Sequence, residues 1–475
     1  MRPDEGDSSS ITWLGLGGAA LLAGCSTSPT REEPPPGPSE WNRFVVAPSD
    51  DEAASQRTAC AYERGSLPAE TQGASHPMGD EIPLDTILVV MMENRSFDHY
   101  FQRLPEYGQP DVDVAPASFT NPDTEGNLVS TFHQQSPCFV DTKHSWRGTH
   151  VQLGNGAMNG FVVSNEGDHE QPARGNLEMF AGRRAMGYHD ETDLPFYYWL
   201  ANEFAIADRY FSSVPGPTFP NRMFLYAASS HGNVHNAVPG DFDVIVEYLE
   251  QREIDWRIYA DATPGLGMYI TKASLILEHV VPVEAYFEDA AAGRLPSFAF
   301  IDPAIGVGTG QYDNNDEHPP ALPQIGEQFV ARLVDALAKS TQWSRSAMFI
   351  TYDEHGGLYD HVAPPQACPP DDIPLKLSPD DPIKGLDRYG LRVPLIVVSP
   401  YARRHHVSHG VYDHTSITRF VEARWTMPAM TARDANALAP WDMFDFSAPP
   451  SEPPVVTIPT VPDEALAVCE AVFGG

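Results

Sequence analysis

Two short runs of the sequence each place polar side chains directly after a mostly apolar segment. In the run TILVVMMENRSFDHYF, residues 86–101, the polar pair is Glu93 and Asn94. In the run FITYDEHGGLYDH, residues 349–361, it is Asp353 and Glu354. Three carboxylates and an amide at the ends of buried segments cost free energy unless a cation compensates them. The two runs therefore predict the halves of one divalent metal site, whose oxygen-rich ligands leave calcium, magnesium and manganese open.

A candidate nucleophile lies between the two acidic runs, in the segment SSVPGPTFPNRMFLYAASSHG, residues 212–232. Thr218 precedes an apolar helical stretch, so its hydroxyl is expected near a helix N-terminus, where backbone N–H groups favour a developing alkoxide. Arg222 follows one turn later and can face the same anion. The alternative is an ordinary helix start with proline in its first turn.

The elements that must position these residues follow from the apolar runs. Four short runs without alternation predict central parallel strands, at residues 86–92, 297–302, 347–353 and 394–399. Apolar spacing predicts a helix over residues 326–340. Strands that alternate with helices predict an α/β fold, a doubly wound and mostly parallel sheet flanked by helices. Such sheets bind ligands at the carboxyl ends of their strands, where both acidic runs emerge.

Composition limits the partners. The 475 residues, 42% of them hydrophobic, are enough for one large domain, expected over residues 81–445. Lys and Arg number 30 against 65 Asp and Glu, which gives a formal charge of −35. This charge disfavours nucleic acid and anionic membrane surfaces as general partners. An anionic substrate must be held by local positive charge.

The N-terminal segment predicts export. Residues 11–21 are apolar but too short to cross a bilayer, and the following LAGC resembles the lipobox of a bacterial lipoprotein. This predicts a signal peptide over residues 1–25, lipidation of Cys25, a Pro/Ser-rich tether over residues 26–80 and a location on the cell envelope or outside the cell. Residues 446–475 are expected to form a Pro-rich tail. The alternative is an uncleaved leader, because Arg2 stands among three acidic residues.

Four further cysteines predict two disulfides in an oxidising compartment. Proximity along the chain favours Cys60 with Cys138 and Cys368 with Cys469. Four free thiols are the alternative.

Four separated motifs together carry a family resemblance. The segments ENRSFDHYF, GPTFPNR, DEHPP at residues 316–320 and YDEHGGLYDHV resemble the bacterial phosphoesterase family that contains phospholipases C and acid phosphatases, within the alkaline phosphatase superfamily. The resemblance extends from about residue 85 to residue 425. It implies a metal bound by Glu93, Asn94, Asp353, Glu354 and the nucleophile Thr218. It also implies catalytic roles for His144, His318 and His355, with His361, His150 and His231 as weaker candidates.

These parts predict hydrolysis of a phosphate ester, a phospholipid or a phosphomonoester, through a phosphothreonine intermediate, with a histidine protonating the departing alcohol. The segment from Thr218 to Arg222 also resembles the sulfatase signature. Threonine cannot become the formylglycine that sulfatases use, so phosphate chemistry is favoured. The alternative is a protein that is not an enzyme: a metal-stabilised surface-binding lipoprotein that has the same fold and catalyses no reaction.

Overall fold

An eight-stranded sheet forms the centre of the computed structural model, which describes residues 40–166, 181–305 and 311–474. The strand order is β12-β6-β11-β10-β1-β9-β7-β8. Along the chain the strands are β1 (Thr86–Met92), β6 (Ala205–Ala207), β7 (Trp256–Ala260), β8 (Val280–Val281), β9 (Phe298–Asp302), β10 (Ser346–Tyr352), β11 (Leu395–Val398) and β12 (His406–Ser408). The two central strands, β1 and β10, are buried along their whole length, which explains their continuous apolar sequence.

The predicted mixed, mostly parallel α/β sheet is confirmed, and three of the four predicted strands have the expected direction. The direction of β11 was predicted wrongly, because β11 runs antiparallel to both β10 and β6. A parallel return needs a crossover connection, usually a helix. Residues 353–394 contain no helix, so the chain comes back to the sheet in the opposite direction.

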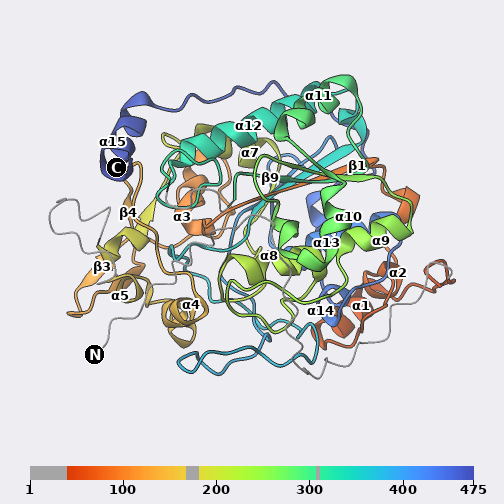
Figure 1. Cartoon of the computed structure of the whole chain (residues 1–475), viewed down its shortest axis with the longest axis horizontal. Helices are drawn as coiled ribbons and strands as arrows, with labels where there is room; N and C mark the ends of the chain where they lie inside the picture. Colours follow the sequence, from red (N-terminus) through yellow and green to blue (C-terminus); the bar gives the residue numbers. More distant parts are fainter. Residues whose placement is uncertain (1–39, 167–180, 306–310, 475) are drawn as a thin grey trace, which may run out of the picture. The chain divides into compact units, whose positions relative to one another are not determined.

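Helices cover both faces of the sheet. Figure 1 shows α11 (Val283–Ala292) and α12 (Pro323–Lys339) along one side, and α8 (Thr218–Ala227) with α13 (His414–Trp425) along the other. The predicted helix over 326–340 is α12, which begins three residues earlier at Pro323. The other helices are α1 (Asp50–Thr58), α2 (Pro68–Thr71), α3 (Phe97–Phe101), α4 (Trp146–Leu153), α5 (Phe161–Ser164), α7 (Pro195–Glu203), α9 (Ile245–Gln251), α10 (Ala273–Leu277), α14 (Ala432–Ala435) and α15 (Asp463–Phe473).

Two short sheets lie outside the main one: β2 (Thr120–Pro122) with β3 (Leu128–Ser130), and β4 (Phe132–His133) with β5 (Gly187–Tyr188). No helix among the described residues is both long and apolar enough to cross a membrane.

The segments that flank the predicted domain are more ordered than the sequence indicated. Helices α1 and α2 lie within the predicted tether, and Trp41 and Leu67 are buried in the main core. At the other end, α15 lies within the predicted tail and buries Cys469. Folded structure therefore begins well before Ile82 and continues beyond the Pro-rich stretch. The predicted signal peptide and Cys25 lie outside the described residues.

Two disulfides are present, but the predicted pairing is wrong. Cys60 is bonded to Cys368, and Cys138 is bonded to Cys469. The bridges span 308 and 331 residues of sequence, so neighbours along the chain are not neighbours in space. The second bridge fixes α15 to the loop that precedes His144.

Candidate active site

The carboxyl ends of β1 and β10 bring the two acidic runs together. The strands are parallel and pair Met92 with Tyr352, so the residues that follow, Glu93 and Asp353, emerge side by side. The Asp353 carboxylate accepts hydrogen bonds from the backbone N–H groups of Asn94, at 3.1 Å, and Glu354, at 2.7 Å. The predicted meeting of the two runs is thus present.

Gly356 allows this close approach. It has a φ of 64°, in the left-handed region, and a Cβ at this position would lie 2.3 Å from the backbone oxygen of Asn94. A side chain here would push the two acidic turns apart.

Three polar side chains at these strand ends fit a cation. Among the described residues, Glu93 Oε2, Glu354 Oε1 and both amide atoms of Asn94 are buried without a hydrogen-bond partner. Unpartnered buried oxygens are costly, and a divalent ion with hard oxygen ligands would satisfy them. Burial, together with the neighbouring Asp353 carboxylate, raises the pKa of Glu93, and burial raises the pKa of Glu354 well above its usual range. The donor set therefore fits the predicted metal ligands.

Arg222 lies behind these ligands. Its side chain is fully buried, Nε donates to Asp353 Oδ2 at 3.0 Å, and Nη2 donates to the backbone oxygens of Met91 and Met92. The third nitrogen, Nη1, is buried without a hydrogen-bond partner among the described residues. This placement indicates that Arg222 positions Asp353, and its contact with the substrate anion stays a prediction.

Thr218 is the first residue of α8 and stands next to the acidic cluster. Its hydroxyl donates to Glu93 Oε1 at 3.3 Å, and its side chain remains slightly exposed, at 4%. Pro217, at the N-cap position of α8, has an extended backbone, and its side chain makes no capping hydrogen bond. The hydroxyl is therefore not used as a helix cap and points to the carboxylates, as a nucleophile requires.

Two histidines face the same region from separate loops. His144 Nδ1 donates to the backbone oxygen of Thr142, and His318 Nδ1 donates to that of Pro319, each at 2.7 Å. Their rings are 5.6 Å apart, and His144 Nε2 lies 4.0 Å from Glu354 Oε1. With Nδ1 occupied in each ring, Nε2 is left to act on a ligand.

Asp141 joins the two histidines and was not assigned from the sequence. One of its carboxylate oxygens is 3.6 Å from His144 Nδ1, and the other is 3.9 Å from His318 Nε2. The ligand atoms of the three residues lie within 4.8 Å of one another, so this group could also bind a metal ion. An acidic residue three positions before His144 was the signal available in the sequence.

We expect His318 to titrate far above its usual range in the metal-free protein. Burial lowers its pKa, but Asp141, Glu93 and Asp316 outweigh burial and raise the pKa to about 9. Because the pKa rises above the ordinary 6.5, the charged ring stabilises the fold fully below pH 6.5, and this contribution is lost as the pH rises through 9. NMR titration of the metal-free protein measures the pKa, with His318→Asn to assign the signal. A midpoint at or below 6.5 would contradict the prediction.

His355 lies against Glu354, whereas His361 lies in a separate charged cluster with Asp98 and Asp360. His355 is buried, with Nε2 bonded to Gln152 Oε1 at 2.7 Å and Nδ1 at 3.3 Å from Glu354 Oε2. Burial lowers its pKa well below the usual range, so the ring is neutral, and its Nδ1 has no hydrogen-bond partner among the described residues. His361 bonds Asp98 at 2.7 Å and Asp113 at 3.1 Å. Both placements indicate that these rings orient other residues.

The two remaining histidine candidates lie apart from the acidic cluster. His231 is stacked on Phe242 with ring centres 3.6 Å apart, and burial lowers its pKa to about 3, as for a neutral packing residue. His150 lies on α4, where Nδ1 donates to the backbone oxygen of Trp146.

A buried carboxylate behind His318 was also missed. Glu317 accepts hydrogen bonds from the hydroxyls of Tyr100, Tyr197 and Tyr352, and its backbone oxygen accepts from Arg95 at 2.9 Å. The next residue is His318, so this network holds the backbone that presents the ring. The tyrosines come from three distant segments, and no local pattern in the sequence connects them.

A hydroxyl beside unpartnered carboxylate oxygens, at the carboxyl edge of a doubly wound sheet, fits the active site of a metal-dependent hydrolase. The family model of the Phosphoesterase family matches residues 84–428. The chain belongs to that family and is a phosphoric ester hydrolase.

Similar proteins include two enzymes named as phospholipases. Non-specific phospholipase C1 of Arabidopsis thaliana is 32% identical, over 78% of this chain and 72% of its own length. Phospholipase C B of Mycobacterium tuberculosis is 27% identical, over 84% of this chain and 85% of its own. Among solved structures, a protein in the alkaline phosphatase superfamily from Vibrio parahaemolyticus is 10% identical over 70% of this chain and 78% of its own, with a TM-score of 0.32.

Proposed function

We propose that this enzyme hydrolyses phosphodiesters of the phospholipid type by transferring the phosphoryl group first to Thr218 and then to water. The observation that carries the proposal is the Thr218 hydroxyl, 3.3 Å from Glu93 Oε1, beside the unpartnered oxygens of Glu93, Asn94 and Glu354. The relatives named as phospholipases C support diester substrates.

One divalent ion, bound by Glu93, Asn94, Asp353, Glu354 and Thr218, would supply positive charge to the threonine oxygen and to the phosphoryl group. Arg222 holds Asp353 in place from behind through the bond at 3.0 Å. The backbone N–H of Gly356 holds Glu354 in the same way, through a hydrogen bond to Oε2 at 2.8 Å. These partners fix the orientation of two of the proposed ligands.

In the first step, Thr218 Oγ1 gives its proton to Glu93, whose Oε1 accepts its hydrogen bond at 3.3 Å, and forms a bond to phosphorus while the bond from phosphorus to the departing alcohol breaks. His144 or His318, protonated at Nε2, gives its proton to that alcohol. In the second step, water attacks the phosphothreonine and passes its proton to the same ring, while the bond from phosphorus to Thr218 Oγ1 breaks. Glu93 returns its proton to Thr218, which restores the hydroxyl as the phosphorylated head group leaves. Burial lowers the pKa of His144 and the carboxylates of Glu354 and Asp141 raise it, with a net rise that favours the acid form.

The experiment offers the purified, metal-supplemented protein phosphatidylcholine and a phosphomonoester side by side. Release of phosphocholine in preference to hydrolysis of the monoester supports the proposal. Preference for the monoester would instead indicate an enzyme of the acid phosphatase type. Failure to hydrolyse either substrate with any divalent metal would favour the surface-binding alternative.

Export and lipidation of Cys25 also belong to the proposal. The two disulfides support it, since such bonds persist in oxidising compartments. We expect metabolic labelling with radioactive palmitate to mark the native chain and to leave Cys25→Ser unlabelled. Equal labelling of both chains, or of neither, would contradict lipidation at Cys25.

A further inference from the structure

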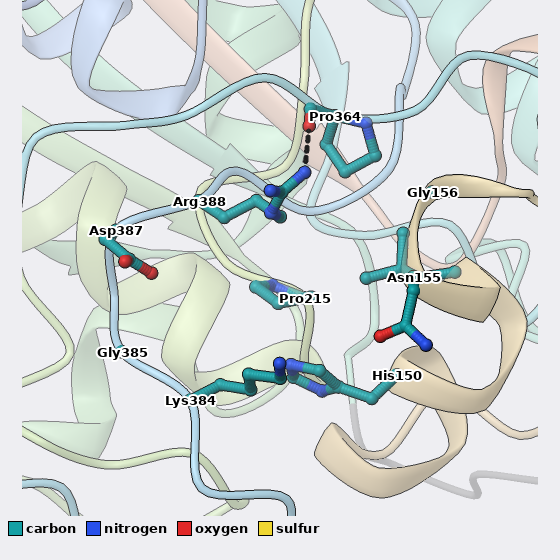
Figure 2. A pocket seen from close by; sticks show the side chains of 10 residues that line it. His150, Asn155, Gly156, Pro215, Pro364, Lys384, Gly385, Asp387 and Arg388 are labelled. Atoms are coloured by element: carbon teal, nitrogen blue, oxygen red, sulfur yellow. Dashed lines mark hydrogen bonds between the residues drawn. The ribbon is translucent and has the colours of Figure 1, made fainter.

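A cavity of about 240 Å³ lies beside the loop that carries the proposed nucleophile. One side is formed by His150 and Asn155, at α4 and the turn after it, and the other by residues 384–388 (Figure 2). Pro215 also lines the cavity and precedes Thr218 by three residues. Three residues of extended chain span at most roughly 11 Å, so the cavity and the nucleophile are close.

Helix α4 links the cavity to the site. His144 lies two residues before Trp146, the first residue of the helix, and His150 follows one turn later. The rings of Trp146 and His150 are 4.4 Å apart, and a Cβ on Gly216 would lie 3.5 Å from the Trp146 ring. The indole therefore packs between the nucleophile loop and the cavity. His144, just before α4, faces the site, and His150, on α4, lines the cavity.

The cavity carries two cations that form no ion pair among the described residues. Lys384 and Arg388 both line it, and neither forms an ion pair within the part of the chain that the structure describes. Arg388 Nη1 donates only to the backbone oxygen of Pro364, at 2.8 Å (Figure 2). Asp387 lies in the same wall without pairing to either cation. In a chain with 65 acidic and 30 basic residues, two unpaired cations at one cavity are unexpected.

His150 is the third titratable group of the cavity. Burial lowers its pKa, the Nδ1 bond to Trp146 and the Asp381 carboxylate raise it, and the charges of Lys384 and Arg388 lower it, with a net fall. Figure 2 shows the Lys384 and His150 side chains converging on the same side of the cavity. In the neutral ring Nδ1 donates to the helix and Nε2 can only accept a hydrogen bond, so the positive charge of the cavity comes from Lys384 and Arg388.

We infer that this cavity binds an anionic group, a phosphate or a carboxylate, carried on the substrate beyond the phosphate that is hydrolysed. The inference rests on the proposed function, whose substrate class it narrows to phosphodiesters with an anionic head group. Sites for whole small molecules usually enclose about 300–1,000 Å³, so a cavity of about 240 Å³ fits a head-group fragment and not an acyl chain. An anion there would pair with Lys384 and Arg388 and compensate both charges.

The test measures binding without turnover. Isothermal titration of the metal-supplemented Thr218→Ala protein would use glycerophosphoserine and glycerophosphoinositol 4-phosphate as anionic probes, with glycerophosphocholine as the neutral one. We expect tighter binding of at least one anionic probe, and which one it is distinguishes a carboxylate from a phosphate. Adding Lys384→Ala and Arg388→Ala should lower the preference for that probe over glycerophosphocholine about tenfold. Lys339→Ala, which removes an exposed lysine from α12, is the matched control and should leave the preference unchanged.

Equal binding of all three probes would overturn the inference, as would a preference that survives the double substitution. These outcomes are separate from a failure of the proposed function, which the native protein reveals by leaving both phosphatidylcholine and phosphatidylserine intact. Circular dichroism of each variant checks that the loop substitutions leave the fold unchanged.

Discussion

Replacing Thr218 by alanine is expected to lower kcat by about four orders of magnitude or more while the protein stays folded. The substitution removes the only oxygen that the proposal places in line with phosphorus, and loss of a nucleophile has effects of this size. Alanine is a good helix former, so the first turn of α8 should persist. Steady-state hydrolysis and thermal unfolding of both proteins measure the two halves of the prediction.

Thr218→Ser is the matched control, because it keeps the hydroxyl and removes one methyl group. We expect it to retain most of the activity. Acid quenching during turnover should trap a phosphate on residue 218 in the native and serine proteins and none in the alanine protein. Hydrolysis by Thr218→Ala within tenfold of the native rate would refute the covalent route and point to direct attack by water.

Replacing Glu354 by glutamine should cost about 100-fold or more in metal affinity and about 1,000-fold in the rate of hydrolysis. The amide has nearly the volume of the carboxyl group, and its oxygen can still accept the hydrogen bond from the Gly356 N–H, at 2.8 Å in the native protein. The substitution removes one negative charge. In the native protein, Glu354 Oε1 has no hydrogen-bond partner among the described side chains and backbone groups. Metal titration and hydrolysis assays at fixed metal concentration measure both effects.

Glu327→Gln provides the control for a buried carboxyl group. Glu327 accepts hydrogen bonds from the backbone N–H groups of Phe196 and Tyr197, and burial raises its pKa to about 8, so it is largely neutral at pH 7. Its replacement should leave metal affinity unchanged. If both variants lose metal equally, the loss reflects general damage to the core; if Glu354→Gln binds metal as the native protein does, Glu354 is not a ligand.

Local sequence was sufficient to predict the centre of the fold and the meeting of its two acidic runs. The runs before Glu93 and Asp353 are apolar on both faces, which only a central strand requires, and two such strands place their following residues at one edge. Thr218 was recognisable because prolines on either side mark a helix start. These signals lie within a few residues of the groups that they position.

The features that were missed depend on contacts between distant segments. The antiparallel direction of β11 follows from a long connection without a helix, and the sequence of β11 itself resembles that of a parallel strand. The ion pair of Arg222 with Asp353 was not predicted, because the two residues lie far apart in the sequence. The spacing of residues along the chain does not predict which charged side chains pair with each other inside the fold.

The bridge between Cys138 and Cys469 makes one part of the site dependent on the order of synthesis. Cys138 precedes Asp141 and His144 in the same loop, but its partner is 331 residues away. A ribosome will have made both acidic runs, the nucleophile and His318 before it reaches residue 469. The loop that carries His144 can therefore be covalently closed only after residue 469 has emerged, and a chain cut short before α15 would keep every proposed metal ligand while leaving that loop untethered.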